Sequence, residues 1–162
     1  MQENIIENLK VKYKNKSKSE LEWSLINSCR TNNFDDVKYL LTSPNLTYFV
    51  NIHADDDVCF RWCCVNGHLE IAKYLLTSPD LKEHANIHAE NDAGFRLACS
   101  YGHLEVVKYL LTSPDLKEHA NIHADNDLAL RWACDYEHED VVSYLIFEQN
   151  ITKTKSIEDY FN

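Results

Sequence analysis

The sequence predicts an all-α solenoid built from four copies of a helix-turn-helix unit. Shifting the sequence by 35 residues superimposes His53 on His88 and His88 on His123, and it superimposes three copies of the segment YLLTSP. The same shift brings four cysteines into one column: Cys29, Cys64, Cys99 and Cys134. A period of about 20 to 50 residues is typical of solenoids, in which each unit buries its apolar face only by stacking on the next. We therefore expect function to lie on a repeated surface.

The repeat region has a further segment on either side. We assign the four copies to about residues 19–50, 51–85, 86–120 and 121–149. Residues 1–18 are polar and lysine-rich but carry aliphatic residues, and we expect them to cap the first copy because terminal repeats need a cover. Residues 150–162 are expected to form either a cap on the last copy or a short linear motif for a partner.

Capping and turn residues predict two helices in the third copy, residues 86–120. Asp92 precedes an apolar-periodic segment, so its carboxylate is expected to cap the first helix. Gly102 ends that helix, because the residue after a helix often adopts the left-handed conformation, which costs other residues roughly 1 kcal/mol. The second helix, LEVVKYLLTS, has apolar residues at i, i+3 and i+7 and ends at Pro114, which lacks a backbone donor.

The first and last copies depart from this pattern. Asn32 takes the glycine position in the first copy, since Asn tolerates the left-handed region better than most residues. Glu137 takes it in the fourth copy, which is the most degenerate and is expected to fray first. The loop 45–50 reads NLTYFV where two later copies read DLKEHA, and we expect Tyr48 and Phe49 to be buried against the N-terminal segment.

The sequences ACSYGHLEVVKYLL and CCVNGHLEIAKYLL closely resemble the ankyrin repeat, whose consensus has two small residues, then GH, then LEVVxxLL. The resemblance covers about residues 19–149 and implies an ankyrin-like solenoid. The family's TPLH is replaced by VCFR, AGFR and LALR, and the finger, which is the loop before each first helix, looks about three residues shorter. HADND followed by ALRWA, with GHLEVVKYL elsewhere, is similar to the ankyrin repeats of large DNA viruses in particular, which suggests a viral origin.

Composition restricts the partner and the compartment. The formal charge of −10 and a pI near 5.2 argue against nucleic acid, because phosphate binding needs a basic face. We expect instead a protein partner with a basic or neutral surface. No secretory signal precedes the cysteines and no stretch approaches about 18 apolar residues, so we expect no membrane contact, a reducing cytoplasmic location and a monomer.

The reactive residues are interpreted as structural. Equivalent cysteines of neighbouring copies are expected about 8 to 10 Å apart, whereas a disulfide needs Cα atoms under about 7 Å apart. Cys59 and Cys63 are four residues apart, but no second pair completes a zinc site. Each candidate nucleophile or base recurs in a neighbouring copy, and no glycine-rich phosphate loop is present. We therefore expect no metal, no cofactor and no catalysis.

Arginine replaces the family's histidine near the start of the first helices. The three positions are Arg61, Arg96 and Arg131. We expect each guanidinium to pair with a finger carboxylate, because acids are plentiful and close in sequence. Examples of such carboxylates are those of Asp57, Asp92 and Asp127. The alternative is an exposed basic stripe that binds an acidic partner.

The resemblance implies a binding surface on the concave face formed by the first helices and the fingers. Aromatic side chains on such a face anchor interfaces, because they bury a large area at low entropic cost. The alternative is that the tryptophans pack as core between neighbouring first helices. The candidate residues are aromatic, apolar or amide positions of the first helices and acidic positions of the fingers: Trp62, Leu97, Trp132, Asn66, Tyr101, Tyr136, Asp55, Asp56, Glu90 and Asp125.

Together these features predict a non-catalytic module that binds another protein through its concave face. The viral resemblance suggests interference with a host or defence protein. One alternative is an inhibitor or sponge that captures a small ligand between the tryptophans, which would need a closed pocket. An enzyme is disfavoured because its candidate residues are repeated.

Overall fold

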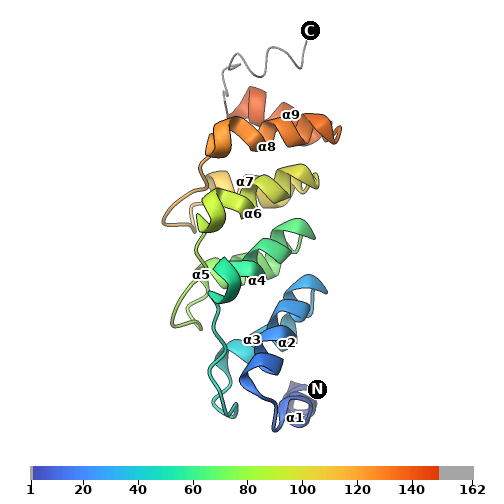
Figure 1. The fold of residues 1–162 in the computed structure, drawn as a ribbon, viewed down its shortest axis with the longest axis vertical. Helices are drawn as coiled ribbons and strands as arrows, with labels where there is room; N and C mark the ends of the chain where they lie inside the picture. Colours follow the sequence, from blue (N-terminus) through green and yellow to red (C-terminus); the bar gives the residue numbers. More distant parts are fainter. Residues whose placement is uncertain (1, 150–162) are drawn as a thin grey trace. The chain divides into compact units, whose positions relative to one another are not determined.

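The computed structural model describes residues 2–149, and in this range the chain forms helices joined by turns and loops, with no strand (Figure 1). The predicted all-α class of repeated helix pairs is therefore confirmed. The chain divides into two compact units, Met1–Cys63 with His68–Asn86, and Cys64–Gly67 with Ile87–Asn162. The predicted cap or motif at residues 150–162 lies outside the described range.

The first unit begins with the segment that precedes the repeats. Its helices are α1 (Gln2–Tyr13), α2 (Lys18–Arg30), α3 (Phe34–Thr42), most of α4 (Ala54–Val65) and α5 (Leu69–Thr77). The Ser17 hydroxyl and the Glu20 carboxylate form a capping box that starts α2. α1 packs against α3, and the Tyr13 hydroxyl donates to the buried Asp36 carboxylate over 2.7 Å. This contact fixes the N-terminal helix on the first copy.

The second unit contains the regular helix pair of the third copy and the irregular pair of the fourth. Its elements are α6 (Ala89–Ser100), α7 (Leu104–Thr112), α8 (Ala124–Asp135), α9 (Glu139–Ser143) and the π-helical turn η1 (Tyr144–Glu148). α6 packs against α7 and α8, and α8 packs against α9. The second helix of the fourth copy is α-helical for 5 residues, against 9 in α7. This shortening agrees with the degenerate sequence of that copy.

A left-handed residue follows each described first helix. The φ angle is 72° at Gly102, and it is 58° and 60° at the equivalent Asn32 and Glu137, so the predicted turn is confirmed. A second constraint acts on glycine: a Cβ added to Gly102 would lie 2.5 Å from Nδ1 of His138. That ring is held in place because its Nε2 lies 2.9 Å from the Ser100 carbonyl oxygen. Glycine at this turn therefore makes room for the histidine of the next copy.

Three cysteines of the column, Cys29, Cys64 and Cys99, lie in the core, and Cys134 is half-buried. Cys64 and Cys99 are fully buried, and all cysteines are free thiols in the structure. Burial raises the pKa of both thiols well above the ordinary value. A thiol with a raised pKa stays protonated and is a poor nucleophile. Their environment therefore fits packing and not reactivity.

Candidate binding face

From the second copy on, each finger ends in three consecutive residues of left-handed backbone, which lie within the bounds of α4, α6 and α8 but are not themselves right-handed helix. A left-handed turn costs an L-residue about 1–2 kcal/mol, and Asp and Asn adopt it most readily because their short side chains hydrogen-bond locally. The many Asp and Asn residues in the finger are therefore explained by the left-handed backbone that this segment adopts. The segments have φ values from 48° to 60° and are Asp55–Asp57, Glu90–Asp92 and Asp125–Asp127.

The last residue of each left-handed segment is a buried aspartate. Asp92 is 4% exposed, and its Oδ1 lies 2.9 Å from Nδ1 of His88 and accepts from the backbone N–H of Asn121 over 2.9 Å. This carboxylate therefore joins its finger to the start of the next copy. It does not take the expected role of a helix cap. The same contacts occur one copy earlier among Asp57, His53 and Asn86.

The repeated arginines bind backbone carbonyls of the left-handed segments. Arg96 donates from Nε to the Asn91 carbonyl over 3.0 Å and from Nη2 to the Glu90 carbonyl over 2.8 Å. These bonds help to offset the strain of the left-handed backbone. Arg96 pairs with a finger carboxylate as expected, but this carboxylate is Asp125 of the next copy, whereas the buried finger aspartates that were named as examples face histidines. Equivalent carbonyl contacts are made by Arg61 to Asp55 and Asp56, and by Arg131 to Asp125.

Arg96 also contacts the fourth copy. Its Nη1 lies 2.7 Å from Oδ2 of Asp125, and the same carboxylate accepts a hydrogen bond from the side-chain amide of Asn91. The guanidinium also lies 5.7 Å from the ring centroid of Trp132, within the range of a cation–π interaction. Arg96 therefore holds a finger acid and an aromatic ring of the next first helix.

The predicted aromatic residues of the second unit lie on two adjacent helices. Tyr101 follows α6 directly and is 54% exposed, and Tyr136 follows α8 and is 59% exposed. Leu97 and Trp132 lie one turn earlier on the same helices and are half-buried. Because α6 packs against α8, the structure places these four residues at equivalent positions of neighbouring helices. We call these four residues the tyrosine face.

The remaining predicted residues are exposed at other places. Asn66, Glu90 and Asp125 belong to the second unit, and Asp55, Asp56 and Trp62, which is 36% exposed, belong to the first. Sequence reasoning missed Trp23 of α2, which is 66% exposed. The repeat pattern does not indicate a binding residue at this position, because the equivalent positions of the other copies hold apolar residues that are not aromatic: Val58, Ala93 and Leu128.

Two aromatic residues of the first unit lie differently from expectation. Tyr48 is 48% exposed and Phe49 is 71% exposed, so their predicted burial against the N-terminal segment is wrong. The N-terminal helix α1 packs on α3 through Tyr13 and leaves this loop uncovered.

The described residues hold no group of three or more His, Cys, Asp or Glu side chains arranged to bind a metal ion. Within residues 2–149, no helix has both the length and the apolar character needed to cross a membrane.

Comparison with known proteins identifies the family. A family model for ankyrin repeats, in three copies, matches residues 62–156, which is more than half of the chain. The chain therefore belongs to the ankyrin-repeat family. Ankyrin repeats are generally protein–protein interaction modules, and proteins built from them are typically non-catalytic. No curated protein and no solved structure matches the chain.

Proposed function

We propose that this chain is a non-catalytic module that binds another protein through the tyrosine face. The observation that carries the proposal is the pair Tyr101 and Tyr136, both more than half exposed at equivalent ends of adjacent helices. Large aromatic surfaces left in water contribute little to folding, whereas their burial against a partner is favourable. Tyrosine and tryptophan are also the residues most enriched among the anchors of protein interfaces.

The tyrosine face is prepared for binding by the contacts beneath it. Leu97 and Trp132 belong to two packed helices, Tyr101 and Tyr136 directly follow these helices, and the Arg96 guanidinium lies 5.7 Å from the centroid of the Trp132 ring. A side chain that is already held in place loses less conformational entropy on association, so more of the contact energy remains as affinity.

Two acidic residues lie beside the tyrosine face and restrict the partner. Asp135 and Glu137 flank Tyr136, and both are exposed. With a net charge of −10, this surface favours a partner with a basic or neutral surface and disfavours nucleic acid. Binding to a basic partner should weaken as salt is added, because exposed charges are screened.

We further propose that the partner is a host or defence protein in a reducing cytoplasm, and that the chain acts as a monomer. The support is the similarity of HADND, ALRWA and GHLEVVKYL to viral ankyrin repeats, together with free, buried cysteines. Trp62, Asn66, Asp55 and Asp56 remain secondary candidates for contact.

The test uses a partner captured by affinity purification and then produced in pure form. Tyr101→Ala combined with Tyr136→Ala should weaken its binding by at least about tenfold, as expected when anchors are removed. The melting temperature should hardly change, because both side chains are largely exposed. Phe147→Ala is the matched control, since Phe147 is 77% exposed but lies outside the tyrosine face. Equal affinity of the double variant and the unchanged protein would exclude the tyrosine face.

A further inference from the structure

The loop after α3 departs from the two loops that correspond to it. In the later copies, Nε2 of His84 lies 2.9 Å from the Ser78 carbonyl oxygen, and His119 repeats this contact with Ser113 over 3.0 Å. Each of these loops is thereby closed by its own histidine. In the first copy the equivalent position holds Phe49, whose ring has no N–H group to make that bond.

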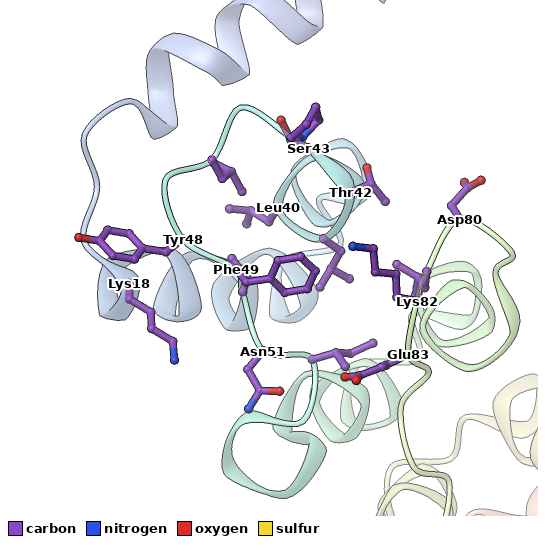
Figure 2. Close-up of a pocket in the computed structure, with 16 residues that line it drawn as sticks. Lys18, Leu40, Thr42, Ser43, Tyr48, Phe49, Asn51, Asp80, Lys82 and Glu83 are labelled. Atoms are coloured by element: carbon purple, nitrogen blue, oxygen red, sulfur yellow. The ribbon is translucent and has the colours of Figure 1, made fainter.

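This replacement accompanies an open groove in the first unit. The groove has a volume of about 630 Å³ and lies between the loop that follows α3 and the loop that follows α5 (Figure 2). Its lining includes the buried side chains of Leu40, Val50, Ile52 and Leu81. Phe49 also lines it but is 71% exposed, so an aromatic ring stands beside apolar surface without being covered.

The ammonium group of Lys82 makes the groove favourable for a negatively charged group. Nζ of Lys82 lies 5.0 Å from the ring centroid of Phe49, and Figure 2 shows its side chain directed toward that ring. Among the described residues, no carboxylate forms an ion pair with Lys82. Glu83 is directed instead to His53, 3.8 Å away, and Asp80 points away from Phe49. A carboxylate beside the ring would therefore meet an available ammonium group.

We propose that this groove is a second docking site, which binds an extended segment of another protein carrying a bulky apolar side chain next to a carboxylate. The apolar side chain packs against Phe49 and the groove floor, and the carboxylate pairs with Lys82. The groove is open to solvent, so a chain segment can cover it along its length, whereas a small ligand would stay half in water. The site goes beyond the tyrosine face, because it belongs to the first unit.

The chain supplies its own control for this site. Replacing the segment NLTYFV by DLKEHA, through Asn45→Asp, Thr47→Lys, Tyr48→Glu, Phe49→His and Val50→Ala, gives the first copy the loop that two other copies already use. We call this the regular-loop variant. It restores a histidine that can bond the Ser43 carbonyl, so it should fold, and circular dichroism melting checks that it does.

The experiment uses a library of random displayed peptides. Peptides that bind the regular-loop variant are first removed from the library, and the remaining peptides are then selected for binding to the unchanged full chain. The enriched peptides should carry an aromatic or branched aliphatic residue beside Asp or Glu. Their affinity should fall at least about tenfold with Phe49→Ala or Lys82→Glu. Lys117→Glu, at the equivalent position of the next copy, should have no effect, and neither should the double alanine variant of the tyrosine face.

Three results would overturn the proposal. The first is that every peptide that binds the unchanged chain also binds the regular-loop variant, so that none remains after those peptides are removed. The second is that Lys82→Glu binds the selected peptides as well as the unchanged protein does. The third is that a synthetic peptide of residues 150–162 binds the groove as tightly as the selected peptides, because the chain's own tail would then be the occupant. None of these results depends on the tyrosine face, so the two proposals can fail separately.

Discussion

Replacing Gly102 with alanine should destabilise the protein by about 2 kcal/mol, and the structure gives the two parts of this cost. The backbone at Gly102 has a φ of 72°, where a residue with a Cβ costs about 1 kcal/mol more than glycine. The new methyl group would also lie 2.5 Å from the His138 ring, which must then move away from the Ser100 carbonyl. Losing that hydrogen bond costs about 0.5–1.5 kcal/mol.

Two further variants separate these parts. Glu137→Gly changes a residue with a φ of 60°, and it should stabilise by up to about 1 kcal/mol, because glycine removes the left-handed strain. Gly102→Asn keeps tolerance for the left-handed backbone but adds the Cβ, so its loss should be smaller than that of alanine. The first copy combines Asn32 with His68, whose Nε2 lies 3.1 Å from the Arg30 carbonyl oxygen, so the ring can adjust.

The assay is urea denaturation followed by circular dichroism, with free energies of unfolding compared across the three variants. The free energy of unfolding should be highest for Glu137→Gly, lower for the unchanged protein, lower again for Gly102→Asn and lowest for Gly102→Ala. Equal losses of free energy of unfolding for Gly102→Ala and Glu137→Gly would refute the assignment of both residues to a left-handed turn, because glycine would then give no advantage at either position.

Further outcomes follow from the finger and the core. Asp92→Ala should cost about 1–3 kcal/mol in urea denaturation, because it removes the buried charged acceptor that binds the Asn121 backbone N–H and contacts the His88 ring. Arg96→Lys should lower the free energy of unfolding by about 1 kcal/mol, because lysine cannot reach two carbonyls and a carboxylate at once. In mass spectrometry after iodoacetamide treatment, half-buried Cys134 should be alkylated before Cys99, whose burial raises its pKa and keeps it protonated.

Periodicity made the helix pairs and their turns predictable from the sequence. The apolar spacing of LEVVKYLLTS and the glycine at position 102 are local signals, and each recurs at a fixed offset, so one copy supports the next. The conformation at Asn32 and Glu137 was predictable for the same reason, because a turn shared by all copies must be made even where glycine is absent.

The finger could not be predicted in this way. Aspartate favours both helix caps and left-handed backbone, so the sequence alone predicts a cap at Asp92, although this residue belongs to a left-handed segment. The choice between the two is made by contacts with other copies, such as the backbone N–H of Asn121. Spacing also paired Arg96 with a carboxylate of the same finger, whereas the structure pairs it with Asp125 of the next copy.

The aromatic residues show the same limit. Hydrophobicity indicated burial for Phe49, but burial needs a neighbouring segment of suitable shape, and α1 lies against α3 instead. The exposure of Tyr101 and Tyr136 was expected from their register in the first helices. The acids that flank Tyr136 are visible in the sequence, but the contact of Arg96 with the Trp132 ring depends on how neighbouring copies pack.

The central claim, that a protein partner covers the tyrosine face, is tested most directly by hydroxyl-radical footprinting of the free chain and of its complex. This method reports how much each side chain is exposed to solvent. Tyr101 and Tyr136, at 54% and 59% exposure in the free chain, should be oxidised much more slowly in the complex, while Phe147, at 77%, should react at its free rate. Unchanged oxidation of both tyrosines in a fully formed complex would contradict the account.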